Sequence, residues 1–270
     1  MTVRVLLVGC GNMGYAMLSG WLSSGKLASS ETLVVEPNED LRHRAARLGG
    51  IVAASTGELP HELSPELIVI AVKPQVIREV VAGCKRFAGT STFLSIAAGT
   101  GIATFTEILG ASTAVMRCMP NTPAAIGKGM MVLFSNPNVA EKTKTFVGDL
   151  LSASGEVATI DNEGLMDAVT AVSGSGPAYI FHFIECLTAA AEKVGLPAET
   201  AKLLAMQTVY GAASLAATSR EDPAVLRKQV TSPNGTTAAA LGVLMGEDRL
   251  KKLLADAVEA ARARSVELGK

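Results

Sequence analysis

The chain has 270 residues, a formal net charge of −1, 49% hydrophobic residues and only 4% aromatic residues. This length allows one large domain or two ordinary ones with substantial cores. The near-neutral charge and the scarcity of aromatic side chains argue against a nucleic-acid partner or a membrane-binding basic face.

Cysteines and histidines are scattered along the chain. No CxxC pair occurs, which is typical of reduced thiols in a cytoplasmic protein, and no metal-ligand pattern links the histidines, so no metal is expected. The first predicted strand follows no basic leader, and no apolar run is long enough to span a membrane. The residues concerned are Cys10, Cys84, Cys118, Cys186, His43, His61 and His182.

A glycine-rich turn directly follows the first β-prone run, Val5–Val8. Gly9, Gly11 and Gly14 form a GxGxxG pattern between a strand and a helix, the context of a dinucleotide-binding turn. Gly9 permits the tight turn, Gly11 lets the backbone approach a pyrophosphate, and Gly14 lets helix and strand pack closely. The helix start, which contains Asn12 and Met13, offers free N–H groups to the phosphates.

Short β-prone runs alternate with helix-like segments through the first half of the chain. Strands are predicted over 3–8, 32–36, 51–53, 67–72, 92–96, 113–118, 129–134 and 156–160. Helices are predicted over 13–23, 39–48, 75–85 and 140–152. The fold class is therefore α/β, with a Rossmann-type, doubly wound parallel sheet.

The second half contains helical patterns alone. Helices are predicted over 177–194, 197–218, 223–230 and 236–268, with Ser175 capping the first. That first helix is apolar nearly all round and must be buried, so we predict a homodimer or higher homo-oligomer through these C-terminal helices. We place a dinucleotide-binding domain at 1–162 and a helical substrate-binding and dimerisation domain at 163–270.

Glu36 ends the second predicted strand, 22 positions after Gly14. An acid here accepts hydrogen bonds from the adenosine ribose and repels a 2′-phosphate, which favours NADH over NADPH. Arg42 and Arg44, on the following helix, offer charge that would compensate such a phosphate. The alternative is a solvated Glu at a strand end.

Two further loops follow buried strands, where ligands of open α/β sheets bind. The first should line the cofactor, with its lysine near phosphate, ribose or a substrate carboxylate; it consists of Ala71, Val72, Lys73 and Pro74. The second, 95–99, contains Ala97 and Ala98, whose small side chains leave room for a flat nicotinamide ring.

A turn before the last predicted helix is the candidate substrate site. Successive N–H groups at a helix start, together with hydroxyls, suit a small carboxylate; plain helix capping is the alternative. The turn consists of Ser232, Pro233, Asn234, Gly235, Thr236 and Thr237.

Six blocks together resemble the pyrroline-5-carboxylate reductase family. In the family's order they are 9–14, 71–74, 95–99, 119–123, 173–179 and 232–237. The resemblance implies a Rossmann domain, a helical domain that interlocks with a second subunit, and NADPH- or NADH-dependent reduction of 1-pyrroline-5-carboxylate, a small imino acid, to L-proline.

The same resemblance implies roles for individual residues. The 9–14 turn would bind pyrophosphate, Ala97 and Ala98 would flank the nicotinamide, and the 232–237 turn would hold the substrate. Thr237 would hydrogen-bond the imine nitrogen, which makes Thr237 and Lys73 the candidate catalytic residues.

The substrate turn departs from the family at one position. Asn234 stands where the family has the first glycine of Ser-Pro-Gly-Gly-Thr-Thr. Asparagine tolerates a left-handed backbone better than most residues, so we expect the turn to persist, with a side chain that can crowd the substrate carboxylate.

Two alternative functions stay open at this point. A related imine or hydroxyacid oxidoreductase shares the two-domain plan, although the hydroxyacid enzymes would need a helical lysine in a context that Lys193 and Lys202 lack. A non-enzymatic nucleotide-binding protein would bind the cofactor without turnover.

Overall fold

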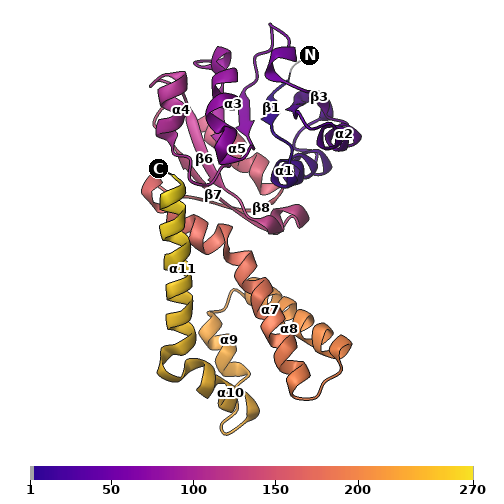
Figure 1. Cartoon of the computed structure of the whole chain (residues 1–270), viewed down its shortest axis with the longest axis vertical. Helices are drawn as coiled ribbons and strands as arrows, with labels where there is room; N and C mark the ends of the chain where they lie inside the picture. Colours follow the sequence, from indigo (N-terminus) through magenta and orange to yellow (C-terminus); the bar gives the residue numbers. More distant parts are fainter. Residues whose placement is uncertain (1–2, 270) are drawn as a thin grey trace. The chain divides into compact units, whose positions relative to one another are not determined.

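The computed structural model of the protein describes residues 3–269. Its first structural unit is built on an eight-stranded sheet (Figure 1). The sheet has the order β3-β2-β1-β4-β5-β6-β7-β8. Its strands are β1 Val5–Val8, β2 Thr32–Val35, β3 Ile51–Ala53, β4 Leu67–Ile70, β5 Thr92–Ser95, β6 Val115–Met119, β7 Gly129–Ser135 and β8 Gly155–Thr159. The six strands from β3 to β6 pair in parallel, as predicted.

The doubly wound parallel sheet departs from the prediction only at its end, where β7 runs antiparallel to β6 and β8 runs parallel to β7. Residues 120–128 connect β6 to β7 through one 3₁₀ turn over Thr122–Ile126. A parallel crossover needs a dozen or more residues, so this connection is too short for one. The chain therefore reverses direction and pairs β7 with the strand it has just left.

Helices cover both faces of the sheet. They are α1 Asn12–Ser23, α2 Glu39–Arg47, α3 Ile77–Gly83, α4 Ile102–Leu109 and α5 Glu141–Ser152. Buried residues of α1, α2 and α5 pack on one face and those of α3 and α4 on the other. Helix α4 was not predicted from the sequence. The Asn38 side chain accepts a hydrogen bond from the Leu41 N–H at the start of α2.

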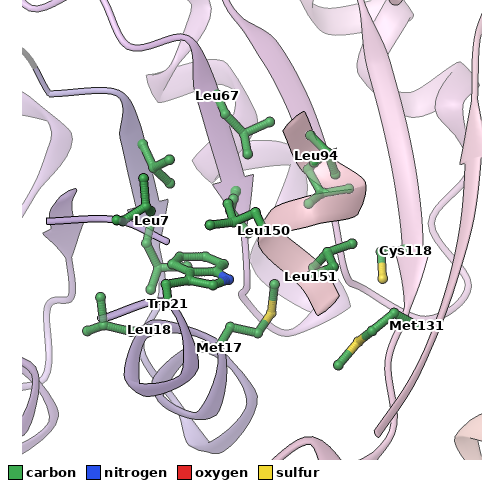
Figure 2. Packing of buried hydrophobic residues seen from close by; sticks show 14 of the residues in the cluster. Leu7, Met17, Leu18, Trp21, Leu67, Leu94, Cys118, Met131, Leu150 and Leu151 are labelled. Carbon is green, nitrogen blue, oxygen red and sulfur yellow. The ribbon is translucent and has the colours of Figure 1, made fainter. Parts of the chain in front are cut away.

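The core follows from the alternation of strand side chains. Leu7 belongs to the cluster on the α1 side and Leu6 to the cluster on the α3 side, and both are fully buried. Figure 2 shows side chains of this first cluster, among them Trp21 of α1 and Leu150 and Leu151 of α5. Strands buried on both faces are typical of parallel sheets, which is why these runs were recognisable in the sequence.

Residues 176–260 form a second compact unit, while 261–269 belong to the first. Its helices are α7 Gly176–Lys193, α8 Ala198–Ser219, α9 Pro223–Gln229, α10 Thr236–Met245 and the first part of α11 Arg249–Leu268. In the single chain, α7 and α8 expose large apolar side chains to solvent; for example, Phe181 is 58% exposed and Leu203 is 67% exposed. Among residues 3–269, every helix is too short or too polar to cross a membrane.

Two expectations for the helical region are wrong. The predicted helix 236–268 is two helices, because Glu247 and Asp248 adopt left-handed φ angles of 56° and 55° between α10 and α11. Ser175 is not a helix cap, because its own backbone is helical and its N–H donates to the Thr170 carbonyl at 2.8 Å. A π-helical turn over Thr170–Gly174 joins α6, Met166–Val169, to α7.

A buried ion pair joins β6 to the segment before α6. Arg117 Nη1 donates to Glu163 Oε1 at 2.8 Å, and the arginine side chain is only 8% exposed. The same Glu163 oxygen accepts the Ile102 N–H at the start of α4. One carboxylate therefore ties three segments of the first unit together.

We predict that Arg117→Leu lowers the free energy of unfolding by about 2–3 kcal/mol, because it leaves a partly buried carboxylate without its cation. Chemical denaturation at fixed protein concentration measures this effect. Arg78→Leu is the matched control, since the Arg78–Glu107 pair is more than 60% exposed on both sides and exposed pairs contribute about 0–1 kcal/mol. Equal losses in the two variants would contradict the argument.

Candidate functional site

Parallel pairing brings the predicted cofactor residues to one edge of the sheet. Val8 pairs with both Val35 and Ile70, and Ile70 pairs with Ser95. The residues that follow these four strand ends therefore lie side by side in the first unit. They are the glycine turn, Glu36, the 71–74 loop and the loop that contains Ala97 and Ala98.

The glycine turn is packed against the end of β4. Gly9 has φ of +92°, and a Cβ atom there would lie 2.6 Å from the Ala71 carbonyl oxygen. A Cβ on Gly14 would lie 2.5 Å from the Gly9 carbonyl oxygen. Gly9 is thus required by its left-handed backbone and by the close approach of β4, and Gly14 by the close approach of the Gly9 carbonyl alone.

Gly11 differs from Gly9 and Gly14, the other two glycines of the pattern. A Cβ there would meet no atom within 4 Å, so packing does not explain this glycine. Gly11 is the N-cap of α1 and supplies no capping side chain, which leaves the first N–H groups of α1 without an intrahelical acceptor. Open space above such a helix start fits a pyrophosphate.

Glu36 is engaged within the protein. It is 6% exposed, its Oε2 accepts the Cys10 N–H at 2.7 Å, and its Oε1 accepts the Asn38 N–H at 2.9 Å. Sequence reasoning assigned this carboxylate to the ribose and missed both backbone contacts. Burial raises the pKa of the Cys10 thiol to about 11, so the turn carries no thiolate at neutral pH that would repel a phosphate.

A cavity of about 470 Å³ adjoins the turn. Its lining comes from the ends of β1, β2 and β3, from the loop after β4 and from α3. The lining residues are Val8, Gly9, Val35, Pro37, Ala54, Ser55, Thr56, Val72, Val76, Glu79, Val80 and Gly83. This cavity and the open helix start together fit a dinucleotide. Most of its lining was missed, although the rule that ligands bind beyond strand ends would have pointed to Ala54–Thr56 after β3.

The remaining cofactor candidates lie in the loops after β4 and β5. Ala97 is buried and Ala98 is half-buried, and the Ala97 N–H donates to Ser95 Oγ at 3.3 Å. Lys73 is exposed and Pro74 begins a 3₁₀ turn before α3. These positions agree with a loop that borders the site, with the lysine at its rim.

Asn121 joins two of the blocks that carried the family resemblance. Its Nδ2 donates to the Ser173 carbonyl at 3.2 Å and to Ser173 Oγ at 3.4 Å, while its Oδ1 accepts the Met130 N–H at 2.9 Å. The side chain is therefore a structural link between the loop after β6 and the π-helical turn. Nothing in the sequence pattern alone indicated this pairing.

The candidate substrate turn lies in the second unit. Asn234 has φ of +57°, as expected from the tolerance of asparagine for this region. The Gly235 N–H donates to the Ser232 carbonyl at 3.1 Å, and a Cβ on Gly235 would overlap Ser232 Oγ. Gly235 is the N-cap of α10 without a capping side chain, so Thr236 and Thr237 stand in a first helical turn with free N–H groups.

The sheet order, the glycine turn and the adjacent cavity define a Rossmann-type dinucleotide-binding protein. Comparison with known families agrees with this class. Residues 4–99 match the family described as NADP oxidoreductase, coenzyme F420-dependent. Residues 163–268 match the family described as pyrroline-5-carboxylate reductase dimerisation.

The chain belongs to the pyrroline-5-carboxylate reductase family. It is 38% identical to the pyrroline-5-carboxylate reductase of Pseudomonas aeruginosa, with 99% of this chain and 97% of the relative covered. It is 36% identical to that of Haemophilus influenzae, with coverage of 98% and 97%. Relatives at this level of identity along their full length establish the family.

Solved structures give the same result. A pyrroline-5-carboxylate reductase from Coxiella burnetii is 33% identical, covers all of both chains and superposes with a TM-score of 0.93. A Plasmodium falciparum pyrroline carboxylate reductase with NADP bound is 30% identical over 99% of this chain and 98% of that chain, with a TM-score of 0.86. An imine reductase from Myxococcus stipitatus, at 16% identity and a TM-score of 0.54, shares the fold alone.

We predict opposite effects from two glycine substitutions in the turn. Gly11→Ala keeps the unfolding midpoint within about 2 °C of the wild type, because its Cβ meets nothing, but raises the KM for NADH at least tenfold by filling the phosphate space. Gly9→Ala lowers the free energy of unfolding by about 2 kcal/mol or more through strain and overlap. Thermal unfolding and steady-state kinetics measure both; unchanged cofactor affinity in Gly11→Ala would contradict the assignment of the turn.

We predict that Asn234→Gly retains activity, with kcat/KM within about threefold of the wild type, because glycine adopts positive φ without strain. Asn234→Val should lower kcat/KM for the substrate at least tenfold, since a β-branched residue is an outlier in this region. Arg220→Val is the control, because Arg220 has φ of 58° outside the turn. Equal losses of activity in the two valine variants would show that the turn has no special role.

Proposed function

We propose that this chain catalyses the reduction of 1-pyrroline-5-carboxylate to L-proline with a reduced nicotinamide dinucleotide. The observation that carries the proposal is the open helix start at Gly11 beside a cavity of about 470 Å³, in a chain that matches pyrroline-5-carboxylate reductases along nearly its full length. A turn shaped for a small carboxylate, 232–237, supports the substrate half of the assignment.

The cofactor supplies a hydride to the imine carbon when it is bound. The chain's own residues bind and orient the two reactants, which is catalysis by positioning. The α1 start holds pyrophosphate, the 71–74 loop borders the cofactor with Lys73 near a phosphate, ribose or substrate carboxylate, and Ala97 and Ala98 flank the nicotinamide. The α10 start holds the substrate carboxylate.

Thr237 is the residue that we assign to the imine nitrogen. Its hydroxyl is both a donor and an acceptor, so it can hold the protonated imine or deliver a proton from water. Thr237 is half-buried and lies in the first turn of α10. This position, next to the N–H groups that suit a carboxylate, supports contact with the ring nitrogen of the same substrate.

We propose that NADH is preferred over NADPH. Glu36 fixes a buried negative charge at the end of β2, held by two backbone amides, and such a charge repels a 2′-phosphate. Arg42 donates to the carbonyl groups of Glu36 and Pro37 at 2.9 and 3.0 Å, so its guanidinium group is already engaged in the absence of a phosphate.

We also propose a homodimer or higher homo-oligomer in which residues 163–270 form the substrate-binding and dimerisation domain and residues 1–162 bind the cofactor. The exposed apolar side chains of α7 and α8 and the dimerisation-family match to 163–268 support this division. The free thiols at Cys10, Cys84, Cys118 and Cys186 support the proposal that the protein functions in a reducing compartment such as the cytoplasm.

The test of this function is the oxidation of NADH and of NADPH, measured separately at 340 nm with pyrroline-5-carboxylate and with its six-membered homologue. We expect turnover with the five-membered imine and a higher kcat/KM for NADH. No turnover with either cofactor would overturn the function, and a strong preference for NADPH would overturn the role of Glu36 in cofactor choice.

We predict that Thr237→Ala lowers kcat/KM for pyrroline-5-carboxylate roughly ten- to a thousand-fold, which corresponds to about 1.4–4 kcal/mol of transition-state stabilisation. The variant loses a hydroxyl at the imine nitrogen while the α10 helix start is retained. Steady-state kinetics measure the loss, and Thr237→Ser, which restores a hydroxyl, is the matched control. Wild-type kinetics in the alanine variant would remove Thr237 from the mechanism.

A further inference from the structure

Arg44 lies over the glycine turn and does more than carry charge near it. Its guanidinium carbon is 4.1 Å from the centre of the Tyr15 ring on α1, and its Nη2 donates to the Cys10 carbonyl at 3.2 Å. Its Nε is buried and makes no hydrogen bond within residues 3–269. The side chain is therefore held by the aromatic stack and by the turn.

The helix that carries Arg44 is itself anchored. Ala45, the next residue of α2, is fully buried in the core cluster on the α1 side of the sheet. This contact fixes the rotation of α2 about its axis, so that the neighbouring Arg44 is directed toward α1. Arginine is suited to this place because a guanidinium group can stack on an aromatic face and donate a hydrogen bond at the same time.

Glu36 completes the arrangement from the other side of Cys10. It accepts the Cys10 N–H at 2.7 Å, while Arg44 binds the Cys10 carbonyl. Both peptide groups that flank the Cys10 Cα are thus held by charged side chains. Cys10 lies between Gly9 and Gly11, two residues whose lack of a side chain leaves the backbone intrinsically free to move.

We propose that Arg44 is a positioning residue for the phosphate-binding turn, and that with Glu36 and Tyr15 it fixes the peptide groups around Cys10 in the geometry that receives the cofactor pyrophosphate. The inference rests on the proposed function, because it concerns the cofactor half of that site. Arg44 acts on the pyrophosphate through the backbone and is therefore required for NADH as well as for NADPH.

The competing role for Arg44 is a charge partner for a 2′-phosphate. The two roles predict different kinetics. A phosphate partner affects NADPH alone, since NADH has no 2′-phosphate, whereas a residue that orders the turn affects both cofactors by a similar factor. Arg42, two residues earlier, donates instead to the carbonyl groups of Glu36 and Pro37 in the β2–α2 loop.

The test is Arg44→Met, with Arg47→Met as the matched control that removes one positive charge from an exposed position of the same helix. We expect Arg44→Met to raise the KM for NADH and for NADPH about tenfold each, with kcat within about twofold of the wild type. Arg47→Met should leave both KM values within twofold. A rise for NADPH alone, or an equal rise in the control, would overturn the proposal.

Two further measurements keep the result interpretable. Tyr15→Leu leaves every charge in place but removes the stack, so it should also raise the KM for NADH severalfold; a wild-type value would count against the proposal. The dissociation constant for NADH, measured by fluorescence titration without substrate, should rise in Arg44→Met by the same factor as KM. This binding test distinguishes failure of the positioning role from failure of the proposed reaction, which would appear as no turnover in the wild type.

Discussion

The approach of the glycine turn to the end of β4 is the constraint on which the candidate cofactor site depends. Gly9 and Gly14 leave no room for a side chain between the turn, Ala71 and the start of α1. This contact directs α1 with its N–H groups toward the space above Gly11 and sets the turn beside the cavity bounded by α3. The order β2-β1-β4 makes the contact possible, because β1 has both strands as parallel neighbours.

Charged side chains also hold the glycine turn and the segments around the sheet in place. Glu36 and Arg44 bind the two peptide groups around Cys10, while Arg117 and Glu163 tie β6 to α4 and to the segment before α6. In each case a charged group meets a partner in a partly or fully buried place, where such interactions are stronger than at the surface. Glu36 and Arg44 hold the backbone of the glycine turn, whereas Arg117 and Glu163 hold β6 and α4 together within the same unit.

Much of the first unit was predictable from the sequence because its signals are local. Runs such as Leu67–Ile70 are apolar since they are buried on both faces, and the glycine spacing follows from the turn itself. The reversal at β7 was not predicted, because it depends on the length of the β6–β7 connection rather than on any strand pattern. The break at Glu247 and Asp248 was also missed, since two consecutive non-glycine residues with left-handed φ angles are uncommon and no glycine or proline stands at the break itself.

The candidate site was predictable to a similar degree. The sequence located the turn, the strand-end loops and the 232–237 turn, each of which has a pattern of its own. It could not show that the Glu36 oxygens bind backbone amides or that Asn121 holds Ser173, because such contacts depend on the distance between segments far apart in the chain. The cavity lining from β3 and α3 was missed for the same reason.

Isotope transfer tests the central claim, hydride delivery to a cyclic imine, most directly. The chain would be incubated with NADH carrying two deuterium atoms at nicotinamide C4 and with pyrroline-5-carboxylate, and the product analysed by mass spectrometry and NMR. The account predicts proline with one deuterium, bound to the ring carbon next to nitrogen that does not carry the carboxylate. Proline without deuterium, or cofactor oxidation without proline, would contradict it.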